Sequence, residues 1–89
     1  MKGEGNQSFG SIEAARRIGI STERLRYWER AGIVKPTYVQ RGTRRFRRYT
    51  QQDIERALFV RDLVDQEKYS LEGAVGKLMR VMDRAGAET

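Results

Sequence analysis

The sequence predicts a mainly α-helical domain with about four helices and one small β-hairpin. Apolar residues recur at helical spacing before residue 32 and after residue 50. Residues 37–49 lose this period and resemble two short strands around a turn. A length of 89 residues suits one domain. We expect the domain to cover residues 9–85, after a disordered tail at 1–8 and before a frayed end at 86–89.

The first two predicted helices are short and almost adjacent. Ser11 is expected to cap the first, and Gly19 suits the left-handed position that ends it. Ser21 is expected to cap the second, which runs to about Ala31 and stops at Gly32. Two short helices joined by a turn of two or three residues predict a helix-turn-helix.

The predicted hairpin is exceptionally basic. Five arginines lie within residues 41–48, around a turn at 41–43 whose loop we expect to be longer than two residues. The mutual repulsion of these arginines would destabilise an isolated hairpin, so a negatively charged partner is implied. Phe46 and Tyr49 are expected to pack the hairpin against the core.

Capping signals and apolar spacing define two further helices. Thr50 and Asp53 approximate a capping box, with Asp in place of Glu, and the apolar residues of 54–64 predict a central helix packed on two sides. Ser70 is expected to cap a fourth helix, whose Leu71–Met82 segment carries one apolar stripe. This stripe serves either the core alone or also a surface for a second copy or another protein. Together the elements predict a winged helix-turn-helix, the hairpin being the wing.

Charge is unevenly distributed along the chain. The formal net charge is +6, but residues 11–50 carry eleven Arg and Lys against three Glu, whereas residues 51–89 carry six against eight acidic residues. A basic half joined to a mildly acidic half predicts one face suited to a polyanion. Most of these cations are arginines, which can grip phosphates and guanine edges with two parallel hydrogen bonds. The alternative is the solvated surface of a protein with a high isoelectric point.

The composition excludes several classes of protein. The absence of His and Cys removes zinc fingers, disulfide scaffolds, thiol chemistry and histidine catalysis. Scattered carboxylates and the lack of a Gly-rich phosphate loop argue against an enzyme, so we predict no catalytic residue, metal or other cofactor. No apolar run is long enough to span a membrane, and no signal peptide is recognisable. We therefore expect a cytoplasmic protein, associated with the nucleoid when bound.

The second helix has the pattern of a DNA-reading helix. On a helical wheel Leu25 and Trp28 fall on one side, and Trp28 is interpreted as a core residue. Arg26 and Arg30 lie one turn apart on the opposite side, so both can reach into a major groove, and Tyr27 is suited to a phosphate. A surface helix held by salt bridges is the alternative.

Double-stranded DNA is the predicted partner, and fourteen residues are candidates to contact it. The recognition helix at 21–31 is expected in the major groove, and the wing at 37–49 on the flanking backbone or minor groove. The candidates are Ser21, Thr22, Glu23, Arg24, Arg26, Tyr27, Arg30, Lys35, Arg41, Thr43, Arg44, Arg45, Arg47 and Arg48.

These residues form a recognisable series. Residues 20–36 read ISTERLRYWERAGIVKP, and RGT, RRYT, DI and YSLE follow at 41, 47, 53 and 69. The series resembles the MerR family of bacterial regulators over about residues 9–82. The resemblance implies a winged helix-turn-helix that binds inverted repeats as a two-fold homodimer, at least on DNA. It also implies that Arg26 and Tyr27 meet DNA from the recognition helix, and that the wing arginines grip flanking phosphates or enter the minor groove.

The chain departs from the family pattern in two ways. Residues 44–46 (RRF) resemble an insertion of two or three residues in the wing, and the chain ends near the close of the fourth helix. It therefore resembles the short members, such as the glutamine-synthetase and heat-shock repressor branch, or a DNA-binding domain of a longer protein. A sequence-specific regulator is the leading hypothesis. An architectural DNA-bending protein and a protein-interaction module using Leu71–Met82 are the alternatives.

Overall fold

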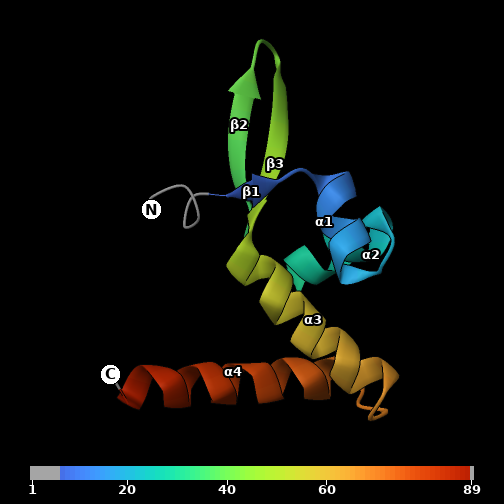
Figure 1. Ribbon diagram of the computed structural model, residues 1–89, viewed down its shortest axis with the longest axis vertical. Helices are drawn as coiled ribbons and strands as arrows, with labels where there is room; N and C mark the ends of the chain where they lie inside the picture. The colour runs from blue at the N-terminus through green and yellow to red at the C-terminus, as the bar shows by residue number, and fades with distance from the viewer. Residues whose placement is uncertain (1–6, 89) are drawn as a thin grey trace.

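The computed structural model describes residues 7–88, and its architecture confirms the mainly α-helical winged helix-turn-helix (Figure 1). Three strands form an antiparallel sheet in the order β1-β3-β2. The hairpin of β2 and β3 projects from the helices, whereas α4 lies at the opposite end of the molecule (Figure 1). The elements are β1 (Ser8–Phe9), α1 (Ser11–Ile18), α2 (Thr22–Arg30), β2 (Thr37–Arg41), β3 (Arg44–Thr50), α3 (Gln51–Asp65) and α4 (Leu71–Glu88).

Strand β1 replaces the end of the expected N-terminal tail. Residues 1–6 lie outside the described part of the chain, but Ser8 and Phe9 pair with Thr50 and Tyr49 of β3. Arg48 donates from Nε to Ser8 Oγ (3.1 Å) and from Nη2 to the Ser8 carbonyl (2.9 Å). Phe9 is buried, so the pairing also secures an apolar anchor. Two residues are too few to show a strand period, which explains why the sequence did not predict this strand.

The helix-turn-helix begins one residue earlier than expected. Gly10, and not Ser11, is the N-cap of α1, and its carbonyl accepts from the Ala14 N–H (2.9 Å). The predicted end of α1 is confirmed, since Gly19 has a φ of +88°. The predicted cap of α2 is also confirmed, because Ser21 Oγ accepts from the N–H of Arg24 (3.0 Å).

The tip of the wing is tighter than expected. The loop consists of two residues, Gly42 and Thr43, because Arg41 already pairs with Arg44. Gly42 has a φ of +61°, whereas Thr43 stays on the negative side, the pattern of a type II′ turn. The expected longer loop was wrong because one Gly is enough to close a two-residue hairpin.

The two-residue turn sets which side chains share each face of the wing. Successive residues of a strand point to opposite faces, and directly paired residues point to the same face. Tyr38 therefore shares a face with its partner Arg47, whereas Val39 and its partner Phe46 lie on the other. Phe46 is 40% exposed, so the prediction that it packs into the core was wrong. It lies too far out on the projecting hairpin to reach the core.

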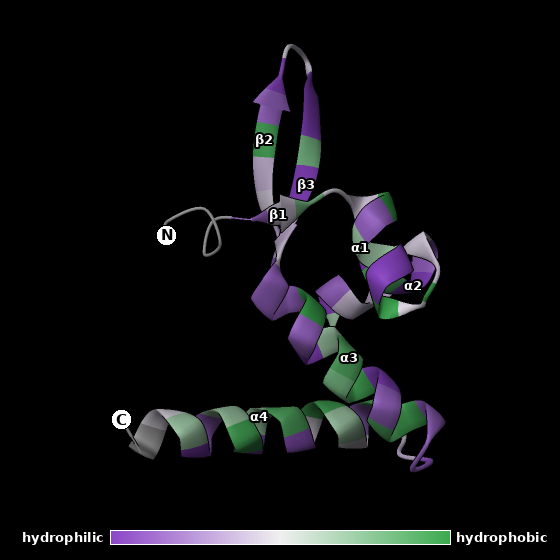
Figure 2. Ribbon diagram, in the orientation of Figure 1, coloured by the Kyte–Doolittle hydropathy of each residue, from purple (hydrophilic) through white to green (hydrophobic). Residues whose placement is uncertain are grey.

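The core lies where α1, α2 and the base of the wing meet α3. Trp28 and Tyr49 are its largest fully buried side chains, which confirms both as core residues. Helix α3 packs against α1, α4 and β3, as its wide apolar surface predicted. Helix α4 joins the core through Ala74 and Leu78 and continues to Glu88, through most of the end expected to fray. Figure 2 shows apolar residues along α4, well beyond its contact with α3.

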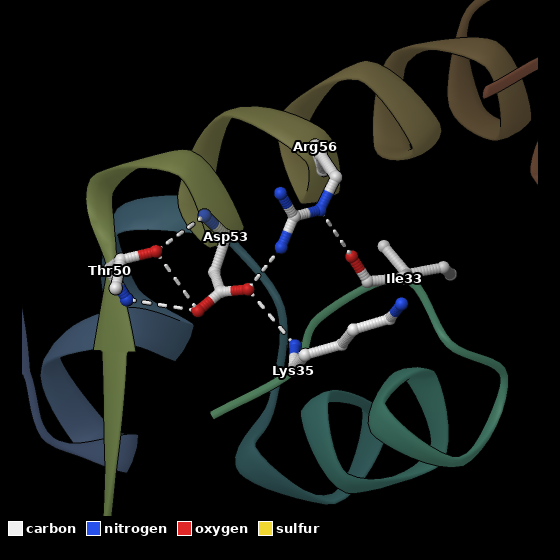
Figure 3. Close-up of polar contacts among 5 residues, drawn as sticks. All are labelled: Ile33, Lys35, Thr50, Asp53 and Arg56. Carbon is white, nitrogen blue, oxygen red and sulfur yellow. Dashed lines mark hydrogen bonds and ion pairs between the residues drawn. The ribbon is translucent and has the colours of Figure 1, made fainter. Parts of the chain in front are cut away.

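A buried carboxylate joins three parts of the fold. Asp53 is 1% exposed and sits in the first turn of α3 (Figure 3). Its Oδ2 accepts from the Thr50 N–H (2.9 Å) and Thr50 Oγ1 (3.2 Å), and Thr50 Oγ1 accepts in turn from the Asp53 N–H (3.1 Å). This is the predicted capping box. Its Oδ1 accepts from the Lys35 N–H (2.9 Å) and from Arg56.

The same cluster holds the segment that follows the recognition helix. Arg56 donates from Nε to the Ile33 carbonyl (3.1 Å), while its other end meets Asp53 (Figure 3). Ile33 and Val34 are fully buried between these polar contacts. The end of β3, the start of α3 and the segment after α2 are therefore held at one point.

We predict that Asp53→Ala lowers the free energy of unfolding by about 3 kcal/mol, because it leaves one end of Arg56 and the N–H groups of Lys35 and Thr50 without their acceptor in a partly buried site. Chemical denaturation measures this loss. Glu55→Ala, which removes an exposed carboxylate from the same helix, is the control and should change stability by less than about 0.5 kcal/mol. Equal losses from both variants would contradict a special role for Asp53.

We also predict that stability declines above about pH 10 partly because of Tyr49. Burial raises the pKa of Tyr49, and nearby Ser11 offsets only part of this rise. The hydroxyl has no hydrogen-bond partner of good geometry among the described residues. Because the unfolded chain then loses this proton at lower pH than the folded one, deprotonation favours unfolding. Tyr49→Phe should show a smaller loss between pH 9 and pH 11 in denaturation experiments, and an identical loss would refute the assignment.

Candidate nucleic-acid interface

Helix α2 presents a polar, largely cationic surface to solvent. Leu25 and Trp28 point into the core, and Glu29 is the one partly buried polar residue of the helix. Seven of the predicted contact residues are exposed along α2 and its N-cap: Ser21, Thr22, Glu23, Arg24, Arg26, Tyr27 and Arg30. Tyr27 is 53% exposed, with the guanidinium of Arg30 5.6 Å from its ring centre. Arg24 similarly covers the edge of the core, 5.1 Å from the Trp28 ring.

The outer part of the wing carries exposed arginines, and Lys35, between α2 and the wing, is also exposed. Arg41 and Arg44 flank the turn as a directly paired couple, with Thr43 exposed between them. Arg45 is exposed on the other face of β3. Like charges directly opposite each other repel, so a bound anion at the tip would relieve a strain that the free wing carries.

Two predicted wing residues are engaged within the protein. Arg47 and Arg48 are both partly buried. Arg48 binds Ser8 of β1, and Arg47 binds Glu29 of α2. The structure therefore divides the five wing arginines into three that project outward and two that fix the base of the hairpin.

Glu29 links the recognition helix to the wing. Its Oε1 accepts from Arg47 Nε (2.8 Å) and its Oε2 accepts from the Tyr38 hydroxyl (2.7 Å). The donors come from β3 and β2 respectively, so one carboxylate holds both strands. The Tyr38 ring in turn has guanidinium groups 4.2 Å (Arg45) and 5.3 Å (Arg47) from its centre.

Burial and charge act in opposite directions on Arg47. Partial burial lowers the pKa of Arg47, but the hydrogen bond and negative charge of Glu29 outweigh it, so that the pKa lies above its ordinary value. The Glu29–Arg47 pair is thus a stable ion pair, with both side chains largely shielded from solvent.

Sequence reasoning missed Glu29, Tyr38 and Ser8. A weak signal for Glu29 was available, because a cation three or four residues further along a helix stabilises a surface Glu by pairing with it. Glu13 of α1 follows that rule with Arg16 and Arg17, both at 2.9 Å. Glu29 has Gly32 and Ile33 at those positions, and in the structure its partners come from the wing.

An open groove of about 630 Å³ runs between the start of α1 and one face of the wing. Ile12, Val39 and Phe46 give it an exposed apolar lining, and Arg41 and Arg48 lie beside them.

Two further findings bear on the chemistry of the described residues. Residues 7–88 contain no group of three or more His, Cys, Asp or Glu side chains arranged to hold a metal ion. No helix within the same range is long and apolar enough to cross a membrane.

Comparison with known proteins gives consistent matches. Residues 11–80 match the family described as "MerR HTH family regulatory protein". The chain is 32% identical over 77 residues to a "Mercuric resistance operon regulatory protein" of Bacillus cereus, covering 85% of this chain and 54% of that protein. It is 39% identical over 49 residues to a "Probable heavy metal-dependent transcriptional regulator" of Haemophilus influenzae, covering 55% of this chain and 37% of that protein. The matches thus span about half or less of each relative.

Proposed function

This chain belongs to the MerR HTH family, whose members are DNA-binding transcription regulators and not enzymes, and we propose that it reads duplex DNA with α2 and grips the flanking backbone with its wing. Helix α2 would lie in the major groove, with Arg26 and Arg30 at base edges and Tyr27 at a phosphate. The outward wing arginines would neutralise phosphates or enter the adjacent minor groove.

The observation that supports this proposal most strongly is the division of labour among the arginines. Arg26 and Arg41 make no hydrogen bond or ion pair within residues 7–88, although each stands on a regular helix or strand. Arg47 and Arg48, in contrast, are used to fix the base of the wing. Unpaired cations on folded elements suit an anionic partner. Few existing side-chain contacts must be broken when such a partner binds, which lowers the cost of binding.

Two copies are proposed to bind one inverted repeat. A two-fold dimer of helix-turn-helix domains places its recognition helices about one helical turn of DNA apart. Helix α4 retains exposed apolar residues beyond its contact with the core, Met79 (39%) and Met82 (43%) among them. The Leu71–Met82 stripe therefore keeps exposed apolar surface in addition to the part that packs on the core. This surface supports its use as the contact between copies or with another protein.

Selection of duplexes from a random or genomic pool tests the function directly. We expect enrichment of an inverted repeat, with a preference of at least about a thousandfold over unrelated DNA. Sedimentation of the complex should then give two chains per duplex. Equal binding to all duplexes, with one steep salt dependence, would contradict the proposal and indicate an architectural DNA-binding protein.

Mutation of the two arginine classes should separate base reading from phosphate binding. Arg26→Ala is expected to cost about 1–3 kcal/mol of binding and to relax preference at one base position, because a bidentate base contact is lost. Arg41→Ala should weaken all sequences alike and flatten the slope of log K against log salt by about one unit.

Titrations of the selected duplex and its point variants at several salt concentrations measure both effects. Arg84→Ala, which removes an exposed cation near the end of α4, is the charge-matched control. If Arg26→Ala and Arg41→Ala both lower affinity for every sequence equally, the assignment of separate roles to α2 and the wing is wrong.

A further inference from the structure

One side chain of α2 contacts both long strands of the wing. Glu29 lies on the last turn of α2, adjacent to Arg30, which is proposed to contact bases. Its two oxygens hold Tyr38 on β2 and Arg47 on β3, at 2.7 and 2.8 Å. Side-chain exposure is only 21% for Glu29 and 28% for Arg47. Water and salt therefore screen this ion pair less than they would screen a fully exposed pair.

The rest of the wing lacks comparable support. Beyond the base, β2 is exposed along its whole length and β3 is exposed from Arg44 to Phe46. Figure 1 shows the hairpin projecting away from the helices, with β1 crossing only at its base. A two-stranded ribbon of this kind has little stability of its own. Its direction therefore depends on the contacts made where it meets the domain.

We infer that Glu29 is a positioning residue for DNA binding: by clamping Tyr38 and Arg47 it sets the angle between the recognition helix and the wing, and so the spacing along the duplex at which both can bind. This inference rests on the proposed function. Within it, Glu29 needs no contact with DNA. Its carboxylate acts on DNA only through the direction it imposes on Arg41 and Arg44 at the wing tip.

If Glu29 acts as this clamp, removing its charge should change DNA affinity in the direction opposite to that expected from electrostatics alone. Removing a negative charge from a DNA-binding face raises its positive potential, which alone would tighten binding to DNA. Loss of the clamp instead spreads the wing over many directions. The apparent affinity then falls by the fraction of molecules whose wing remains correctly aimed. Weaker binding after a change that makes the protein more positive would therefore identify positioning.

The test compares Glu29→Gln with the wild-type chain on two duplexes. The long duplex carries the selected site with its flanks, and the short duplex keeps the central bases but lacks the flank protected by the wing. We expect Glu29→Gln to weaken binding to the long duplex by about tenfold, to lose protection of the flank from hydroxyl radicals, and to bind the short duplex as the wild type does. Glu67→Gln removes an exposed carboxylate after α3 and should bind both duplexes like the wild type.

Two outcomes would overturn the inference. Unchanged or tighter binding to the long duplex, with the flank still protected, would mean that the wing needs no clamp. Equal weakening on both duplexes would mean that Glu29 acts on α2 or on general stability. Tyr38→Phe, which removes one donor and keeps the ring, provides a milder variant with the same expected sign should Glu29→Gln fold poorly.

Residual dipolar couplings of the free protein test the clamp independently of the proposed DNA binding. In the wild type, amides of the wing and of the helices should fit one common alignment, and in Glu29→Gln the couplings of the wing should shrink. Unchanged couplings would overturn the clamp without reference to DNA. Absence of any duplex preference in the wild type would overturn the proposed function, while the couplings would still decide the clamp.

Discussion

The fold depends on the buried carboxylate of Asp53. A charge removed from water must be met by donors on every side, and here two donor residues lie three positions away on either side of Asp53 while the third, Lys35, lies 18 residues earlier. The Thr50 N–H and hydroxyl lie at the end of the wing, the Lys35 N–H lies after the recognition helix, and Arg56 lies one turn further along α3. None of these segments can shift without leaving a buried polar group unpaired. Asp53 therefore helps to set the position of the wing base relative to the recognition helix, together with the contacts of Arg47 and Arg48.

Asp53 and Glu29 together orient the wing relative to the helices. Asp53 fixes where the wing leaves the domain, and Glu29 fixes the direction in which it continues. Between them Ile33 and Val34 are fully buried, which anchors the segment that joins α2 to β2. The arginines that remain unpaired, Arg26 among them, thus project from elements whose relative placement is already determined. Binding then avoids much of the entropy cost of ordering a flexible basic segment.

Local signals predicted most of the elements, whereas the contacts between elements had to come from the structure. Caps at Ser21 and Thr50 are chosen by neighbouring backbone groups, so they can be recognised in sequence. The turn at Gly42 was located correctly but its length was not, because a Gly permits several loop lengths. Strand β1 and the Glu29 clamp join residues far apart in sequence, and no periodicity records such pairing. The exposure of the predicted contact residues on α2 follows from the helical wheel, whereas the partial burial of Arg47 and Arg48 does not, and the roles of all these residues on DNA stay a prediction.

In the proposed complex, α2 and the wing meet the same duplex at two places set by the fold. Because the sequence contains no cysteine, Thr22→Cys on α2 and Thr43→Cys at the wing tip each create a single site for an iron chelate that cleaves nearby DNA. We expect the α2 label to cut within the selected half-site and the wing label to cut the flanking backbone, as two narrow clusters at a constant offset. Coincident cutting, or diffuse cutting from the wing label, would contradict a wing held in a fixed direction from the recognition helix.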